Sequence, residues 1–564
     1  MRTKIKYIIA IFLLIAISCQ DEILDKKINT AFTTQSVFGD IETAKLNLLQ
    51  SYNSLETWGM VGGPSGAWWL NKACMKPAAS DEAWFHWTPS QFPQNLGVMD
   101  ESNMGYFQAT WGIYYKWIGN LNSWFQEMEN SVLIDEFTDE SEELMGEAKF
   151  LRANLYLKLV NFWGGVPLIK EPFELTDDFN RDRDSYEECI EYIVSELDEA
   201  ADMLPETRPD PEWGRVTKGA CLALKSRALL YAASELHDSN TQPGGPFYDY
   251  KKSTKWEDAA NAAKAVLDLN LYSMVQVNDW KEYHNIFIGN SSEVILARPF
   301  HPEFGDKNGL PDKANSPGGY NGWAVNQASH NVAQAYEMAN GKMINEPGSG
   351  YDSSPEKIYE NRDPRFYANI LFNGVEYRGR DVEYWTPGGL DSKDGLMGDI
   401  HEVETGYCIR KFMHEDYDFD SEGAPIPFIN IRLAEIYLNY AEALYHSGDE
   451  TNARINLNLV RDRVGMPWVE TSGQELLDDI RHERRIELCF EGFHRYNDAR
   501  RWMTAEEEFN KPLEGIQWSK DPASGELSYE VRTVEPRIFQ PQYYYLPIPL
   551  SEINKTELEQ NWGY

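Results

Sequence analysis

Basic residues are scarce in this sequence relative to acidic ones. Its 564 residues include 52 lysines and arginines but 90 aspartates and glutamates, which gives a formal net charge of −38. A chain with this charge is repelled by phosphate backbones and by anionic lipid surfaces. Nucleic acid is therefore not an expected partner. Apolar residues make up 42% of the chain, which is typical of a globular rather than a disordered protein.

Cysteines are few, and they lack the C-x-x-C spacing of thiolate metal sites. Cys19 follows an N-terminal hydrophobic run, and the other five are Cys74, Cys189, Cys221, Cys408 and Cys489. This odd number argues against a disulfide framework and, without that spacing, against a thiolate metal site. Cys189 and Cys221 lie in helical patterns, so we expect both to be buried as small hydrophobic side chains.

Motifs of several enzyme classes are also missing. None of the ten histidines forms H-E-x-x-H, and the Gly-rich stretches lack the strand-then-helix setting of a phosphate-binding loop. Glycoside hydrolysis needs two carboxylates across a cleft, about 5 Å or about 6.5–9.5 Å apart. Asp81 and Glu82 are adjacent, which by itself does not make such a pair; a distant pair among the 90 acids stays open. No cofactor is expected.

One acidic stretch, residues 415–423 (EDYDFDSEG), has the aspartate spacing of a calcium-binding loop. Such a loop places Gly at its sixth position and Glu at its twelfth. Counted from Asp416, those positions hold Ser421 and Pro427. The pattern favours a solvated acidic loop over a calcium site, and no metal ligand is assigned.

Long hydrophobic runs are absent apart from residues 7–17 (YIIAIFLLIAI), which follow the cationic start MRTKIK. A membrane-spanning helix needs about 20 apolar residues, so this run is too short and instead matches an export signal. Residues 15–19 (IAISC) resemble a bacterial lipobox, in which the signal is cleaved before a cysteine that becomes lipid-modified. Ser18 stands where Gly or Ala is commoner, and an ordinary secretory signal with a chance cysteine is the alternative.

The residues after this cysteine resemble a targeting signal. Residues 20–22 (QDE) resemble the acidic tag that directs some bacterial lipoproteins to the outer face of the outer membrane. We therefore predict a signal peptide over residues 1–18 and a lipidated tether over residues 19–30. Cys19 would be the lipid attachment point that holds the mature chain at the cell surface.

Helical periodicity dominates the N-terminal half. Residues 147–169 repeat apolar side chains at helical spacing until Gly164-Gly165, and in residues 185–204 Ser185 and Glu188 predict a capping box. A second, alanine-rich pair of helices is predicted over residues 217–236, which open at Thr217, and residues 255–269.

The clearest helical pair spans residues 432–465. Two apolar stripes flank the turn at Gly448-Asp449, and length and small residues resemble a tetratricopeptide unit of about 34 residues. The earlier pairs look like degenerate versions of the same unit. We therefore predict a mainly α fold, in which a tetratricopeptide-like scaffold is assembled from non-consecutive pairs and carries long irregular loops and few short strands.

Residues 480–502 (IRHERRIELCFEGFHRYNDARRW) are dense in charge. Placed on one helix, Glu483 and Glu487, and likewise Glu491 and Arg495, are lateral neighbours. We expect a salt-bridged structural face that ties this helix to the tetratricopeptide-like pair, with no ligand role.

Helical periodicity fades where Gly, Pro, Asn and Asp mix with aromatic residues, in residues 58–100 and 299–426. Long loops on a rigid scaffold commonly carry binding sites. We divide the mature chain beyond the tether into an N-terminal helical region, a loop-rich ligand-binding insertion and a C-terminal region with the tetratricopeptide-like pair: residues 31–298, 299–426 and 427–564.

The aromatic residues of these loops are the candidate ligand contacts. A sugar ring has a C–H face that packs on flat aromatic surface and a rim of hydroxyls that amides and carboxylates can bind. Most tryptophans in folded proteins are nonetheless buried, so the alternative is that these aromatic residues belong to the hydrophobic core. The candidates are Trp323, Tyr320, Asn321, Trp84, Trp87, Asp81, Trp68 and Trp385.

Five segments, in this order, resemble the signatures of the SusD/RagB family. They are FLRANLYLKLVNFWGGVPLI, RVTKGACLALKSRALLYAA, IRLAEIYLNYAEAL with LNLVRDRVGMP, IRHERRIELCFEGFHRYNDARRW and YYLPIPLSEINKTELEQNWGY. The resemblance covers residues from about 25 to 564. It implies an outer-membrane surface lipoprotein, not an enzyme, that binds an oligosaccharide and delivers it to a TonB-dependent, SusC-like transporter. Peptide capture by the same architecture and, less favoured, a glycan-cleaving enzyme are the alternatives.

Overall fold

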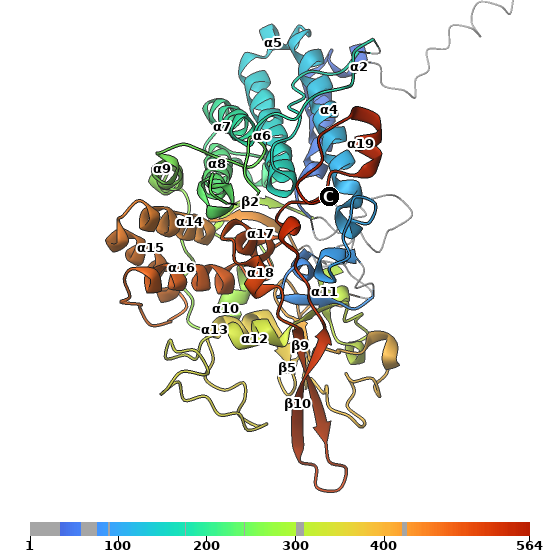
Figure 1. Cartoon of the computed structure of the whole chain (residues 1–564), viewed down its shortest axis with the longest axis vertical. Helices are drawn as coiled ribbons and strands as arrows, with labels where there is room; N and C mark the ends of the chain where they lie inside the picture. Colours follow the sequence, from blue (N-terminus) through green and yellow to red (C-terminus); the bar gives the residue numbers. More distant parts are fainter. Residues whose placement is uncertain are drawn as a thin grey trace, which may run out of the picture.

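The computed structural model describes residues 34–57, 76–87, 91–174, 176–241, 243–300, 310–419 and 426–564. Over these residues the chain is mainly helical, and its short strands pair only two by two (Figure 1). This confirms the predicted fold class. None of the described helices is both long and apolar enough to cross a bilayer.

The helices of the described residues are α2 (Thr34–Val37), α3 (Ile41–Leu49), α4 (Thr110–Glu129), α5 (Leu133–Glu136), α6 (Thr138–Trp163), α7 (Tyr186–Met203), α8 (Lys218–Ala233), α9 (Lys255–Asp268), α10 (Trp280–Asn285), α11 (Leu310–Asn315), α12 (His330–Ala335), α13 (Pro364–Asn369), α14 (Leu433–His446), α15 (Glu450–Asp462), α16 (Gln474–Glu487), α17 (His494–Arg501), α18 (Ala505–Glu508) and α19 (Leu550–Thr556). The strands are β1 (Ala83–Phe85), β2 (Val294–Arg298), β3 (Asn326–Ala328), β4 (Ile370–Phe372), β5 (Glu376–Tyr377), β6 (Arg380–Asp381), β7 (Tyr407–Ile409), β8 (Phe428–Arg432), β9 (Leu513–Lys520) and β10 (Leu527–Glu535). They form the antiparallel pairs β1–β3, β2–β8, β4–β7, β5–β6 and β9–β10.

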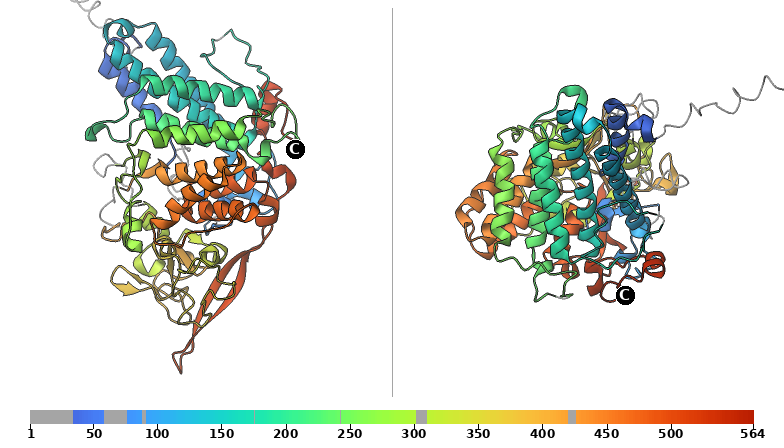
Figure 2. Two further views of the ribbon diagram at one scale, coloured as in Figure 1. Left: turned by 90° about the vertical axis from the view of Figure 1, so that its left-hand side faces the viewer. Right: turned by 90° about the horizontal axis from the view of Figure 1, so that it is seen from above.

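A helical scaffold fills the upper part of the molecule. Helices α6, α7, α8, α9 and α14 pack side by side in that order, and α15 and α16 pack on α14 (Figure 2). The chain leaves the scaffold after α9 and returns to it at α14. The segment between these helices, which includes the predicted insertion, is therefore held at both ends. The scaffold is thus assembled from non-consecutive helix pairs, as predicted.

Local capping chemistry fixes where these helices begin. The Ser185 hydroxyl accepts a hydrogen bond from the Glu188 amide (3.2 Å) while the Glu188 carboxylate accepts one from the Ser185 amide (2.9 Å), which confirms the capping box. The Thr217 hydroxyl likewise accepts from the Ala220 amide (3.3 Å) at the start of α8. These bonds satisfy backbone donors that a helix leaves unpaired in its first turn.

The pair α14–α15 is the predicted tetratricopeptide-like unit. Its small and aliphatic stripes are buried, and Gly448 takes the positive φ (87°) that the turn between the two helices requires. Asp449 then caps α15 by accepting from the Asn452 amide (3.1 Å). The apolar stripes predicted from the sequence are therefore the buried faces of these two helices.

The charged segment 480–502 is not one helix, contrary to the prediction. Helix α16 ends at Glu487, and α17 starts at His494 after a turn in which Phe490 and Gly492 have positive φ. Glu491 and Arg495 consequently do not pair with each other. Glu491 binds Lys411 and Arg432 instead.

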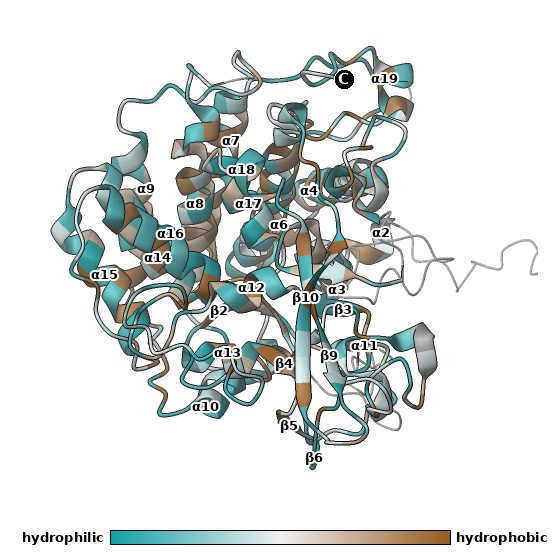
Figure 3. Cartoon of the chain, turned by 60° about the horizontal axis from the view of Figure 1, so that its bottom comes forward, coloured by the Kyte–Doolittle hydropathy of each residue, from teal (hydrophilic) through white to brown (hydrophobic). Residues whose placement is uncertain are grey.

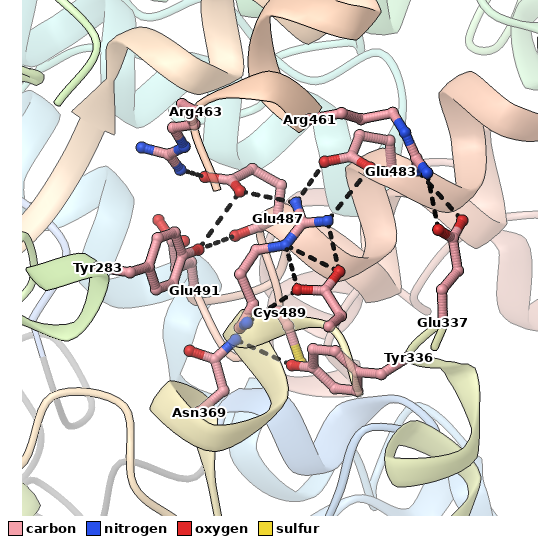
Figure 4. A network of polar contacts seen from close by, with 12 residues as sticks. Tyr283, Tyr336, Glu337, Asn369, Arg461, Arg463, Glu483, Glu487, Cys489 and Glu491 are labelled. Carbon is pink, nitrogen blue, oxygen red and sulfur yellow. Dashed lines mark hydrogen bonds and ion pairs between the residues drawn. The ribbon is translucent and has the colours of Figure 1, made fainter. Parts of the chain in front are cut away.

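Buried charges connect the scaffold to the lower part of the molecule. Glu483 and Glu487 of α16 point into a network with arginines from α15, β8 and α13 (Figure 4). Arg461, for example, donates to Glu483 (3.0 Å) and to Glu337 (2.7 Å), which follows α12. The expected ion pairs are present, but Glu483 and Glu487 bind arginines that are distant in sequence rather than lateral neighbours.

The lower part contains the insertion and the β9–β10 hairpin. Residues 310–419 are largely irregular, with α11–α13 and β3–β7 as short elements. The hairpin projects at the bottom of Figure 1, and hydrophilic and hydrophobic bands alternate along it in Figure 3. This hairpin was not among the predicted elements.

The cysteines of the described residues behave as hydrophobic side chains. Cys189, Cys221, Cys408 and Cys489 are buried and unpaired. For Cys189 and Cys221 this confirms the prediction. Cys19 and Cys74 lie outside the described residues.

Candidate ligand-binding site

Strand pairing between β1 and β3 brings two predicted tryptophans together. Trp84 pairs with Gln327 in this antiparallel ribbon, so the residues after β1 lie beside those before β3. Trp87 and Trp323 occupy these positions, with ring centroids 5.3 Å apart and planes inclined by 43°. Both rings are half-buried. We call Trp87 and Trp323 the tryptophan pair.

His401 supports the tryptophan pair from the side. Its Nδ1 lies 2.9 Å from the Trp323 carbonyl, and its ring centroid is 6.5 Å from that of Trp87. Burial lowers the pKa of His401 and outweighs the opposing effect of the Trp323 carbonyl. The imidazole is therefore neutral at pH 7, and its Nδ1–H donates to that carbonyl.

A tight turn precedes Trp323 and presents Tyr320. Gly318–Tyr320 form one 3₁₀ turn, and Asn321 follows in the left-handed region (φ 62°) with its side chain exposed. Gly319 has no room for a side chain because a Cβ there would lie 2.3 Å from Asp391 Oδ1. The glycines thus let this turn lie directly on its neighbours.

Tyr320 is held by an arginine that sequence analysis missed. The Arg380 guanidinium lies 3.7 Å from the ring centroid of Tyr320, and the Tyr320 hydroxyl donates to the Arg380 carbonyl (3.0 Å). Asp391 accepts two bonds from the same guanidinium (2.7 and 2.9 Å). Burial, and next Asp391, raise the pKa of Tyr320, so the phenol stays protonated. Nothing in the sequence linked residues 320, 380 and 391.

Trp385 lies at a separate position, beside the hairpin. The Lys520 ammonium sits 4.3 Å from its ring centroid, and Thr386 forms a backbone bridge with Ser519 of β9. The Gly389 amide donates to the Trp385 carbonyl (3.0 Å) and closes the loop. The half-buried indole therefore belongs to a surface shared by the insertion and β9.

Two other predicted residues lie beneath this surface. Trp84 is 7% exposed and its indole N–H donates to Glu535 (3.3 Å). Asp81 accepts from Arg485 (2.7 Å) and Arg495 (2.8 Å). The structure places both as anchors of β1, with Trp84 buried and Asp81 only partly exposed. Trp68 lies outside the described residues.

The carboxylates that start β1 have opposite electrostatics. Burial disfavours the charge on Asp81, but Arg485 and Arg495 outweigh it and hold its pKa well below the usual range. Burial, and next the charge of Asp81, raise the pKa of Glu82 to about 8. Asp81 is therefore ionised and Glu82 protonated at pH 7, and the pair sits under the ribbon rather than facing a cleft. Among the described residues, no three His, Cys, Asp or Glu side chains gather as a metal site.

Comparison with known proteins identifies the architecture. Residues 278–564 match the model of the SusD family, and residues 33–230 match a second SusD-like model described as starch-binding and associating with the outer membrane. The chain belongs to the SusD family. Members of this family are binding proteins without catalytic activity, so this SusD-like chain is not an enzyme.

Individual relatives cover almost the whole chain. A SusD-like protein of Bacteroides ovatus is 24% identical over 523 residues, which are 89% of this chain and 83% of the relative. A SusD-like crystal structure from Bacteroides fragilis is 27% identical, with a TM-score of 0.77, and the match covers 94% of this chain and 98% of that one. A SusD-like carbohydrate-binding protein of the same species has 24% identity, a TM-score of 0.74 and coverage of 93% and 99%.

Proposed function

We propose that this SusD-like chain captures an oligosaccharide at the tryptophan pair and Tyr320. The observation that carries the proposal is the tryptophan pair itself, two half-buried indoles from segments more than 230 residues apart. Paired aromatic surface fits the C–H face of a sugar ring. One solved relative is described as carbohydrate-binding, which supports the same ligand class.

Polar groups at the edge of the tryptophan pair match sugar hydroxyls. Asn321 presents an exposed amide next to Tyr320, and the Arg380 guanidinium lies over the ring of that tyrosine. Trp385, with Lys520 over its ring, offers a second stacking position for a longer chain. Trp84 and Asp81 take part indirectly, by holding β1 in place.

The cellular role extends the proposal. We infer that Cys19 carries a lipid, that this lipid anchors the chain at the surface of the outer membrane, and that a SusC-like, TonB-dependent transporter receives the glycan. The export signal, the lipobox-like residues and the outer-membrane association of the matched family model support this. Mass spectrometry of the mature N-terminus tests the lipid, and co-purification from native membranes tests the transporter.

Calorimetry with a panel of oligosaccharides tests the ligand class, with peptides as the competing ligands. We expect at least one oligosaccharide to bind and Trp323→Ala to weaken it by about tenfold or more, because stacking area is lost. Trp468→Ala is the matched control, since Trp468 is 51% exposed and follows α15 on the scaffold. Binding of peptides alone, or equal affinity in both variants and the wild type, contradicts the proposal.

A further inference from the structure

A second aromatic groove lies on the scaffold, away from the tryptophan pair. It encloses about 230 Å³ between the loop that joins α7 to α8 and the segment that leads into β2. Trp213 and Tyr272 line it together with Thr207, Asn290 and Ser291, and residues 294–297 of β2 form one wall. We call this the Trp213 groove. It shares no residue with the site described above.

A backbone hydrogen bond and close packing fix the loop that carries Trp213. Its backbone amide donates to the Asp210 carbonyl (3.1 Å), and the next residue, Gly214, has a φ of 97°. A Cβ on Gly214 would lie 2.5 Å from the Pro299 ring, so the loop packs directly on the end of β2. The indole is half-buried, and among the described residues its N–H has no hydrogen-bond acceptor.

The polar lining of the groove has unused hydrogen-bonding capacity. The Ser291 hydroxyl is buried and lacks a partner among the described residues. Buried polar groups in folded proteins are normally satisfied, and a rotation of the Ser291 side chain toward the groove would give its hydroxyl a water or ligand partner. Thr207 and Asn290 add a hydroxyl and an amide that make no side-chain bonds within the same part of the chain.

The arginines beside the groove are paired, whereas the carboxylate of Glu206, which lines it, has no ion-pair partner among the described residues. Arg208 is paired with Glu143 and with Glu147 (3.0 Å), and Arg215 with Glu147 and Glu212. No guanidinium is therefore left to attract an anion. Partly exposed aromatic faces, free hydroxyl and amide groups and an unpaired carboxylate that repels anions suit a neutral polyol better than an anionic or a purely apolar ligand.

We propose that the Trp213 groove binds one neutral pyranose ring and is a second glycan site of this protein. At about 30 Å³ per water molecule its volume equals about eight waters, which is the scale of one sugar ring with its hydroxyls. The inference rests on the proposed function only in that the chain meets glycans. Two sites on one chain would raise its avidity for a long polysaccharide without any new contact at the first site.

Fluorine NMR of fluorotryptophan-labelled protein tests both sites in one titration. Trp213→Phe and Trp323→Phe assign the two resonances, and Trp468, which is exposed outside both sites, is the internal control. The probes are the methyl glycosides of glucose, galactose, mannose, xylose and N-acetylglucosamine. We expect the Trp213 signal to shift saturably with at least one of them, to keep shifting in Trp323→Ala, and to titrate about threefold to tenfold more weakly in Ser291→Ala.

The outcomes separate the two ideas. A shift of Trp323 without any shift of Trp213 overturns the second site and leaves the proposed function standing. A shift of Trp213 alone supports the groove and counts against the tryptophan pair. If neither signal moves, or if Trp468 moves equally, the groove is not a sugar site.

Discussion

At the scale of single residues, the binding surface depends on side chains that never reach it. Asp81 holds β1 against α16 and α17 through Arg485 and Arg495. Arg537 adds bonds to the Ser80 and Ala83 carbonyls (3.1 and 3.3 Å). These bonds beneath β1 therefore fix the position of Trp87, which follows the strand.

Replacing Asp81 by Asn keeps the shape but, among the described residues, leaves Arg485 without a carboxylate partner and Arg495 with Glu508 alone. Because Asp81 is partly exposed, we expect unfolding to become easier by about 2 kcal/mol, less than the 3–5 kcal/mol of a fully buried pair. Affinity for the oligosaccharide should fall as well, since β1 positions Trp87. Scanning calorimetry and titration calorimetry measure the two effects. Glu508→Gln is the control because it removes a carboxylate from Arg495 but not from Arg485, and it should lower the free energy of unfolding by less.

Glu82 predicts a pH effect of the opposite kind to ordinary acids. It is 2% exposed, accepts one bond from the Phe490 amide (3.2 Å), and its other carboxyl oxygen has no partner among the described residues. Its pKa of about 8 lies above the unfolded value of about 4.3. The stability that protonated Glu82 contributes is thus complete below about pH 4 and is lost as the pH rises to about 8.

Glu82→Gln removes this dependence because glutamine mimics the protonated acid. The variant should gain stability relative to the wild type between about pH 5 and 8, by at most about 5 kcal/mol, and the gain should level off above pH 8. Urea unfolding at unit pH steps measures it, and Glu507→Gln on the surface controls for the amide substitution. A constant difference across this range would show that Glu82 is ionised in the folded protein.

At the scale of elements, the helices were predictable and their breaks were not. The capping residues Ser185 and Thr217 are local signals, and they mark α7 and α8 as expected. The turn between α16 and α17 depends instead on distant groups: the Phe490 amide donates to Glu82, and Lys411 donates to the Glu487 and Cys489 carbonyls. No periodicity within residues 480–502 contains that information.

The candidate site was likewise predictable in part. Composition pointed to the segments that hold Trp87 and Trp323, because aromatic residues stood among glycines and amides. That β1 and β3 pair with each other could not be derived, since more than 230 residues separate them and many other pairings fit the same pattern. Arg380 and His401 were missed for this reason. The β9–β10 hairpin was different, because the alternation in LSYEVRTVE after DPASGE was a readable signal.

The tip of this hairpin should be dispensable. Residues 521–526 are exposed and bond only among themselves, while Lys520 and Leu527 face each other in the ladder. An Asn-Gly turn in place of the tip therefore closes the hairpin, and we expect stability and affinity to stay within about 0.5 kcal/mol of the wild type. Trp518→Ala is the contrasting variant, because Trp518 is 2% exposed; it should cost about 3–5 kcal/mol. Denaturant unfolding compares them, and a large loss on tip replacement would assign the tip a role.

At the scale of the whole molecule, buried ion pairs join helices that are distant in sequence. Arg227 of α8 donates to both carboxyl oxygens of Glu435 (2.7 and 2.6 Å), and Arg501 of α17 does the same to Glu442 (2.6 and 2.7 Å). Both glutamates belong to α14. Helix α14 therefore links the N-terminal scaffold to the C-terminal region through charge as well as packing.

These pairs predict acid unfolding. Burial alone would raise the pKa of Glu435 and Glu442, but Arg227 and Arg501 outweigh it and lower each pKa to about 2. The unfolded value is about 4.3, so each pair contributes stability that is present above about pH 4 and is lost as the pH falls to about 2, on the order of 3 kcal/mol. Glu442→Gln should therefore be less stable than the wild type at pH 7, and this difference should shrink as the pH approaches 2.

Circular dichroism in the near and far ultraviolet follows this loss from pH 7 to pH 2. Because α14 contacts helices from both halves of the scaffold, we expect tertiary and helical signals to fall together in the wild type. Glu552→Gln, on the exposed helix α19, is the control and should follow the wild-type curve. If the difference between Glu442→Gln and the wild type stays constant down to pH 2, the pair of Arg501 and Glu442 does not govern acid stability.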